Sequence, residues 1–367
     1  MRIALLSPLF EPVPPQRYGG VERIVGVLCK ELARRGNDVT LFASGDSLTP
    51  ARLIPCAPRS LRLLPDVQDQ LALHVVQLTR VSEMAGEFDV IHNHLGCPSY
   101  PFARHWPTPN VTTLHGRLDL PELGLVFSHY RDINMVSISN HQRKPVEHLG
   151  LSWAGTVYNG VDLDLFSFQP GGPYLVFLGR VSKVKGVHLA VEVARRVGMP
   201  LKIAVKVEAD PRWCQEYVAP LLVDPLIEFI GEVDEREKNA LLGGAAALLF
   251  PVQWPEPFGL VMIEAMACGT PVIALRQGAV PEVVADGRTG FICDSVAEMV
   301  LSVGRLGEID RMECRRHVER YFSAQTMTDG YEAVYRRLAA VLGRSNASVH
   351  VQPPLNVQDT AGMGNSA

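Results

Sequence analysis

The amino-acid sequence predicts an α/β fold built from two doubly wound, parallel-sheet domains that face a central cleft. Three observations lead to this prediction. The chain has 367 residues, 47% of them hydrophobic, and this length favours two domains over a single core. Short apolar runs alternate with helix-length segments along most of it, as in βαβ units. A turn-rich stretch at 159–172 separates two such series.

In the first half, apolar runs predict buried parallel strands. They are Ile3–Ser7, Val39–Ala43, Val90–His92, Val111–Leu114 and Met135–Ile138. Each run is followed by a segment long enough for a helix. Parallel strands that are covered on both faces read as nearly continuous apolar runs, so this series predicts a sheet between two helical layers.

The second half repeats the same organisation, so both halves are expected to be Rossmann-like. Its predicted strands are Tyr174–Leu178, Leu201–Val205, Ile227–Ile230, Ala247–Phe250 and Val272–Leu275. Ligands of open α/β sheets bind outside the carboxyl ends of the strands. Two such domains therefore present their loops to a shared cleft.

Four segments follow from this organisation. We expect an N-terminal domain at 1–165, a C-terminal domain at 166–325, and a C-terminal helix at 326–344 that packs back on the N-terminal domain. Residues 345–367 are polar, with paired prolines and almost no charge, and predict a disordered tail.

The composition argues against several functional classes. A formal net charge of −4 without a Lys/Arg cluster argues against nucleic-acid binding. Seven scattered cysteines, never spaced C-x-x-C, indicate neither a disulfide framework nor a zinc site and favour a reducing cytoplasm. The first apolar run is too short for a signal peptide or a membrane span. No basic amphipathic helix for membrane docking is evident, although peripheral membrane contact is left open.

The stretch Trp254–Pro271 keeps two carboxylates, Glu256 and Glu264, in an otherwise apolar run. Pro257 suits the first turn of a helix that is predicted over 258–267. The free N–H groups of Phe258 and Gly259 would then form an anion site between the two carboxylates, which suits a nucleotide sugar. Spacing alone favours a plainer interpretation, in which Glu256 complements the helix dipole and Glu264 is solvated.

Residues 256–274, EPFGLVMIEAMACGTPVIA, closely resemble the E-x7-E segment of glycosyltransferase family 4, whose members are retaining enzymes of the GT-B fold. Further segments resemble this family in order along the chain. They are the glycine loop Tyr18–Glu22, the Thr-x-His segment Thr113–Gly116, the interdomain turn Asn159–Asp162, a diphosphate clamp of Gly179–Arg180 with Lys185–Gly186, and the region Gly278–Phe291.

The resemblance implies an enzyme that moves a sugar from a nucleotide-diphosphate donor to an acceptor hydroxyl with retained configuration. The N-terminal domain would be the acceptor side, and the C-terminal domain would bind the donor. Catalytic roles are implied for His115, Arg180, Lys185 and Glu256. Donor binding is implied for Gly19, Gly20, Arg180, Lys185, Phe258, Gly259, Leu260 and Glu264.

The resemblance also implies how these residues act. His115 would hydrogen-bond the sugar near the reacting carbon, Glu256 would orient the sugar, and Glu264 would hold the ribose. The leaving phosphate would itself take the acceptor's proton.

No cofactor and no metal are expected. Arg180 and Lys185 would supply the positive charge for a departing diphosphate. A literal D-x-D, Asp162-Leu163-Asp164, lies in the interdomain turn and is not interpreted as a metal site. The triplet His92-Asn93-His94 superficially resembles a metal or HNH-nuclease pattern, but without neighbouring Cys or paired carboxylates it is interpreted as a strand end lining the cleft.

Two departures and several open points remain. Lys206-Val207-Glu208 stands where many relatives carry glycines, which leaves the donor open, and Val184 replaces an acidic residue before Lys185. Base preference is expected to depend on the loop after Ile230. The segments 97–106 and 116–123 should select the acceptor, but they are compatible with a sugar, a lipid or a small aglycone. A GT-B nucleotide-sugar 2-epimerase and a non-enzymatic nucleotide-sugar sensor are the alternative functions.

Overall fold

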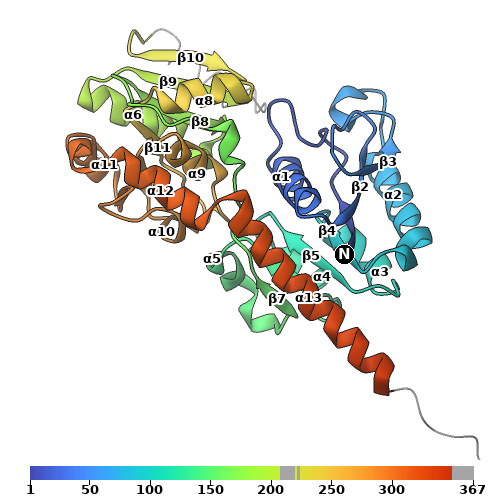
Figure 1. The fold of residues 1–367 in the computed structure, drawn as a ribbon. Helices are drawn as coiled ribbons and strands as arrows, with labels where there is room; N and C mark the ends of the chain where they lie inside the picture. Colours follow the sequence, from blue (N-terminus) through green and yellow to red (C-terminus); the bar gives the residue numbers. More distant parts are fainter. Residues whose placement is uncertain (207–219, 221–223, 349–367) are drawn as a thin grey trace, which may run out of the picture.

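The computed structural model describes residues 1–206, 220 and 224–348, and it contains two α/β lobes joined side by side (Figure 1). Each lobe has a parallel sheet with helices on both faces, which confirms the predicted GT-B class of fold. In the described part of the chain, no helix combines the length and the apolar character that a membrane span requires.

The first lobe contains a seven-stranded sheet in the order β3-β2-β1-β4-β5-β6-β7. Its strands are β1 (Arg2–Leu6), β2 (Asp38–Ser44), β3 (Arg52–Ala57), β4 (Val90–Asn93), β5 (Asn110–Leu114), β6 (Met135–Ser137) and β7 (Trp153–Thr156). Its helices are α1 (Gly20–Arg34), α2 (Gln70–Met84), α3 (Tyr100–Ala103), α4 (Pro121–His129) and α5 (Asn140–Arg143).

The second lobe contains a six-stranded sheet in the order β10-β9-β8-β11-β12-β13. Its strands are β8 (Leu175–Arg180), β9 (Leu201–Lys206), β10 (Ile227–Gly231), β11 (Ala247–Phe250), β12 (Val272–Leu275) and β13 (Gly290–Cys293). The helices that follow in the chain are α6 (Val187–Val197), α8 (Glu235–Gly243), α9 (Leu260–Ala267), α10 (Val280–Val283), α11 (Val296–Val303), α12 (Arg311–Tyr321) and α13 (Ala324–Ser348).

All of the predicted strands are present, and three further strands were not predicted: β3, β7 and β13. Each of the three lies at an edge of its sheet. An edge strand pairs on one side only and needs no continuous apolar run, and β3 even contains Pro55, which central strands do not tolerate. The apolar-run criterion therefore finds every central strand but only one of the four edge strands, β10.

Successive side chains of the strands in the first sheet point to opposite faces, and both faces are buried. Ile3 and Leu5 of β1 pack in the cluster that contains α1, whereas Ala4 and Leu6 pack in the cluster on the α2 side. In the second lobe, the described residues form one large apolar cluster around β8 and β11. Both lobes thus hold the carboxyl ends of their strands on rigid, fully packed supports.

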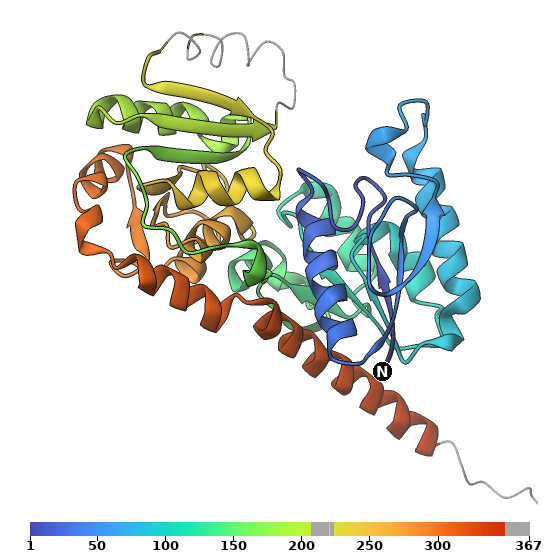
Figure 2. The ribbon, with the colours of Figure 1, turned by 45° about the horizontal axis from the view of Figure 1, so that its top comes forward.

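Helix α13 returns from the second lobe and lies along the first lobe beside α1 (Figures 1 and 2). Tyr331 and Tyr335 of this helix are fully buried in the same cluster as β1. The helix extends to Ser348 and so includes 345–348, which were predicted as part of a disordered tail. The remainder of that predicted tail lies outside the described residues.

The chain crosses between the lobes twice, and the two crossings pair with each other. The Val161 N–H donates to the carbonyl of Phe322 at 2.9 Å, and the Ala324 N–H donates to the carbonyl of Val161 at 2.9 Å. A Cβ atom on Gly160 would lie 2.4 Å from the Ser323 carbonyl oxygen, so this approach of two backbones requires glycine. The predicted interdomain turn Asn159–Asp162 is therefore one of two chain segments that connect the lobes, and the other is the segment around Ser323.

Candidate active site

A cavity of about 980 Å³ lies between the lobes, where the strand order of each sheet reverses. In the first lobe it is lined by Pro8 after β1 and His94 after β4. In the second lobe it is lined by Arg180 at the end of β8 and Val252 after β11. Open α/β sheets bind ligands at such reversal points. The two lobes therefore contribute equivalent edges to one site.

Two helices begin at this cavity and face each other across it. A Cβ atom on Gly20, the first residue of α1, would lie 3.7 Å from Cδ1 of Leu260, the first residue of α9. The unpaired N–H groups of a helix start carry partial positive charge, so the converging starts make the cavity attractive to an anion. Gly19, Gly20, Phe258, Gly259 and Leu260 all line it.

Helix α9 begins at Leu260, later than the predicted start at Phe258. The reason is Gly259, whose φ of +85° is left-handed and ends the preceding irregular segment. A Cβ atom there would lie 2.7 Å from Cε of Met262 and 2.9 Å from Cζ of Phe250. Phe258 precedes the helix, and its side chain is buried beside Tyr158 and Phe322.

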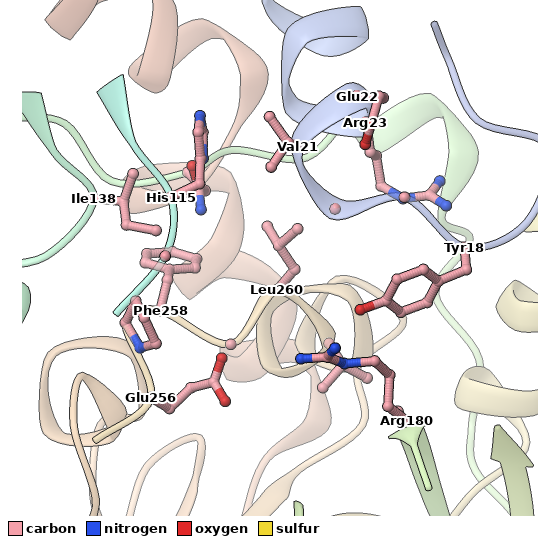
Figure 3. A pocket seen from close by; sticks show the side chains of 18 of the residues that line it. Tyr18, Val21, Glu22, Arg23, His115, Ile138, Arg180, Glu256, Phe258 and Leu260 are labelled. Atoms are coloured by element: carbon pink, nitrogen blue, oxygen red, sulfur yellow. The ribbon is translucent and has the colours of Figure 1, made fainter. Parts of the chain in front are cut away.

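Glu256 is 8% exposed and is held by two side chains. Lys185 Nζ lies 2.5 Å from its Oε2, and Trp254 Nε1 donates to the same oxygen at 2.8 Å. Lys185 also lies 4.9 Å from the centroid of the Trp254 ring. Figure 3 shows the Glu256 carboxylate and the Arg180 guanidinium directed toward the same space beside the start of α9, with the Tyr18 hydroxyl facing Arg180.

Glu264 is 4% exposed, so the interpretation of this residue as solvated is wrong. Its Oε1 lies 2.6 Å from Lys238 Nζ and 3.8 Å from Arg23 Nε. Burial favours the protonated form of Glu264, but the charges of Lys238 and Arg23 outweigh it and hold its pKa below the ordinary value. Burial lowers the pKa of Lys238 to about 8, against the opposing attraction of Glu264. Glu235 of α8 pairs with both cations and completes the cluster.

His115 follows β5 and lines the cavity, where its Nε2 lies 2.8 Å from Nδ1 of His94. Burial lowers the pKa of His115 to about 4, so the ring is neutral at physiological pH and can act only as a hydrogen-bonding group. Burial, together with His92 and His115, also keeps the pKa of His94 well below its ordinary value. Behind them, His92 is bonded to Tyr335 Oη and Thr113 Oγ1, each at 2.7 Å.

The structure brings the predicted residues of both lobes together, and it adds residues that the sequence analysis did not assign. Trp254, Lys238 and Arg23 line the cavity and contact predicted residues, and His94, which was expected only to line the cleft, is also bonded to His115. Trp254 begins the stretch Trp254–Pro271, and Arg23 directly follows the glycine loop Tyr18–Glu22. Their positions beside these segments could have marked both as candidate site residues. No local signal marked Lys238, because its partner Glu264 lies on another helix.

Glu22 lines the cavity and is a buried carboxyl near Glu11 and Arg62. Burial raises its pKa from 4.5 to about 7. Above pH 7, ionised Glu22 therefore lowers the free energy of unfolding, because its charge is buried in the folded state. Below pH 4.5 the carboxyl is protonated in both the folded and the unfolded state, and this loss of stability disappears.

We expect Glu22→Gln to stabilise the protein by roughly 2 to 3 kcal/mol at pH 8 and to have little effect near pH 4.5. The reason is that glutamine mimics the protonated carboxyl at every pH. Urea unfolding at both pH values measures the difference, with exposed Glu83→Gln as the control. Equal stability of Glu22→Gln and the unaltered chain at pH 8 would contradict this assignment.

The D-x-D and H-x-H patterns of the sequence lie in different environments. Asp162 accepts from Lys30 Nζ at 2.6 Å and caps the short turn Leu163–Leu165. His94 of the His92-Asn93-His94 triplet lines the cavity, as expected, whereas His92 is bonded inside the first lobe. Lys206 ends β9, but its side chain and Val207-Glu208 lie outside the described residues.

Comparison with known families divides the chain at the same place as the fold. The model described as Glycosyltransferase Family 4 matches residues 18–165, and the model described as Glycosyl transferases group 1 matches residues 166–306. Together the two matches cover the helix starts of α1 and α9 and the residues Arg180 and Lys185.

Curated glycosyltransferases are similar in sequence to this chain along most of their length. A D-inositol 3-phosphate glycosyltransferase of Pseudarthrobacter chlorophenolicus is 26% identical over 80% of this chain and 83% of its own. A phosphatidyl-myo-inositol mannosyltransferase of Mycobacterium leprae is 28% identical over 80% of this chain and 83% of its own.

Solved structures share the fold. AviGT4, a glycosyltransferase involved in avilamycin A biosynthesis, has a TM-score of 0.69 at 23% identity and covers 92% of this chain and 98% of its own. Anabaena HepE in complex with UDP-glucose has a TM-score of 0.69 at 17% identity, over 94% of this chain and 100% of its own. The chain is therefore an enzyme of the group 1 glycosyltransferases, family 4, with the GT-B fold.

Proposed function

We propose that this enzyme transfers a sugar from a nucleoside diphosphate donor to an acceptor hydroxyl, with retention of configuration and without a metal. The observation that carries the proposal is the convergence of two helix starts with Arg180 and Lys185 on one cavity between the lobes. A diphosphate is the part of the donor that needs such a site, because its charge increases as the glycosidic bond breaks.

The cations supply enough stabilisation for this step. A positive charge about 4 Å from a phosphate charge contributes about 4 kcal/mol at an effective dielectric constant near 20. Arg180 can bond two phosphate oxygens at once, and Lys185 adds a compact charge with three donors, one of which Glu256 engages. We therefore assign both to the leaving diphosphate and no metal or cofactor to the reaction.

The carboxylates receive the two ends of the donor. Glu256 is fixed by Lys185 and Trp254, and we assign its carboxylate to the hydroxyls of the sugar. The ion pairs of Glu264 with Lys238 and Arg23 are both made by Oε1, so we assign Oε2 to the ribose hydroxyls. Glu232 and Val233, which follow β10 and line the cavity, are assigned to the side of the base.

The reaction needs no protein base in this arrangement. The acceptor oxygen forms a bond to the anomeric carbon as the bond from that carbon to the phosphate oxygen breaks, on the same face. The acceptor's proton passes to the departing phosphate oxygen. Neutral His115 is assigned to hydrogen-bond the sugar near the reacting carbon, for which its low pKa is suited.

A nucleotide screen tests the proposal directly. We expect one of UDP, GDP and ADP to raise the melting temperature, and the matching nucleotide sugar to release nucleoside diphosphate slowly in water with EDTA present. NMR of the transferred sugar then reports its anomeric configuration. Formation of an altered monosaccharide would instead indicate an epimerase, and binding without turnover would indicate a sensor.

A further inference from the structure

The first lobe contributes an apolar pocket to the cavity, formed by the loops after β4 and β5 and by α4. We call it the apolar pocket; it comprises Leu95, Cys97, Tyr100, Leu118, Leu123 and Phe127. Tyr100, Leu118 and Phe127 belong to the hydrophobic core of the lobe, and the other three pack against that core. The pocket is therefore a rigid apolar recess next to His115.

Two buried polar atoms at this pocket have no hydrogen-bond partner among the described residues: Tyr100 Oη and His94 Nε2. Tyr100 is 0% exposed, and both residues line the cavity. The other ring nitrogen of His94 is bonded to His115. Burying a polar group without a partner lowers stability, so atoms kept in this state at the wall of a cavity indicate a ligand that satisfies them.

Two arginines that line the cavity, Arg117 and Arg62, are paired with carboxylates. Nε and Nη2 of Arg117 donate to the two carboxylate oxygens of Asp119, each at 2.6 Å. Arg62 pairs with Glu11 and lies 3.6 Å from Glu232. Arg17 also lines the cavity, from the exposed loop before α1. A phosphate group in the apolar pocket would compete with these carboxylates for Arg117 and Arg62.

We propose that the acceptor is an uncharged molecule with an apolar body, such as an aromatic or alkyl glycoside. This inference rests on the proposed glycosyl transfer. The apolar body occupies the apolar pocket, and hydroxyls of the acceptor bond Tyr100 and His94. The hydrogen bond between His94 and His115 then places the acceptor beside the residue assigned to the sugar ring. The assignment differs from a phosphorylated acceptor of the kind named for the inositol 3-phosphate relatives.

Binding of three matched probes tests the class of acceptor. With the protein saturated by the nucleoside diphosphate that stabilises it, we measure phenyl β-glucoside, methyl β-glucoside and glucose 6-phosphate by calorimetry. We expect phenyl glucoside to bind at least about tenfold more tightly than methyl glucoside, and glucose 6-phosphate to bind most weakly. Tightest binding of glucose 6-phosphate, or equal binding of the two neutral glucosides, would overturn the proposal.

Helix α4 offers a matched pair of variants that locates the binding. Leu123→Asp places a charge in the apolar pocket and should remove the advantage of phenyl glucoside. Leu125→Asp lies on the same helix but is 78% exposed and does not line the cavity, so it should preserve that advantage. If Leu123→Asp leaves phenyl glucoside binding unchanged, the pocket is not the acceptor site. The thermal shift by the nucleoside diphosphate is measured in both variants, so that loss of donor binding is recognised separately.

Tyr100→Phe removes only the unpartnered hydroxyl. We expect its melting temperature to equal or exceed that of the unaltered protein, while its affinity for phenyl glucoside falls about five- to tenfold. Tyr335→Phe is the contrasting variant, because its hydroxyl is bonded to His92 at 2.7 Å, and it should lower the melting temperature. If Tyr100→Phe is destabilised like Tyr335→Phe, or if its probe affinity is unchanged, the hydroxyl has a structural role only.

Discussion

Replacing Lys185 with alanine should lower kcat about a thousandfold, with a much smaller change in nucleotide affinity. An ammonium about 4 Å from a diphosphate charge contributes about 4 kcal/mol at an effective dielectric constant near 20, and we expect most of that charge to develop in the transition state. The variant also removes the partner that fixes Glu256 in the cavity. Steady-state kinetics with the identified donor and nucleotide titration measure the two effects separately.

Lys183→Ala is the matched control for this experiment. Lys183 lies two residues away in the same short turn, Lys183–Lys185, but it is exposed and does not line the cavity. Its removal should leave kcat within about twofold, because a solvated charge at that distance is screened. A loss of less than about tenfold in Lys185→Ala, or equal losses in both variants, would refute the assignment of Lys185 to the leaving group.

Glu264→Ala should destabilise the protein by about 3 to 5 kcal/mol, in addition to any loss of nucleotide binding. The substitution leaves Lys238 and Arg23 without their shared buried carboxylate, and breaking one partner of a buried ion pair has an effect of this size. Lys238 can limit the loss by releasing its proton, because its pKa is already lowered to about 8. Urea unfolding measures the change.

A rescue experiment separates the structural and the binding roles of Glu264. Adding Lys238→Met to Glu264→Ala removes the unpaired charge and should recover most of the stability, while nucleotide affinity stays low. Glu308→Ala, which opens an exposed pair with Arg305, should have a much smaller effect on unfolding. Unchanged stability of Glu264→Ala would show that the cluster is not a buried ion pair, and full nucleotide affinity in the double variant would exclude Glu264 from ribose binding.

The central strands and the residues at their ends were predictable from sequence, whereas the partners of those residues were not. The sequence of a buried parallel strand is a nearly continuous apolar run, so the strands that precede His115 and Arg180 could be predicted. The E-x7-E segment identified Glu256 and Glu264 as candidate site residues. The pairing of Glu264 with Lys238 and Arg23 joins three helices, α9, α8 and α1, and only tertiary packing brings them together. The late start of α9 depended on the left-handed backbone of Gly259, which a propensity for helix does not reveal.

Helix α13 makes the first lobe discontinuous in the chain. The buried side chains of Met327, Tyr331, Val334 and Tyr335 complete a core whose other buried members come from the first 160 residues. As the chain leaves the ribosome, that core stays open on one side until the whole second lobe has been synthesised. During synthesis, the first lobe therefore exposes the apolar surface that α13 covers in the complete chain. An isolated fragment that ends before the second lobe would keep this surface exposed.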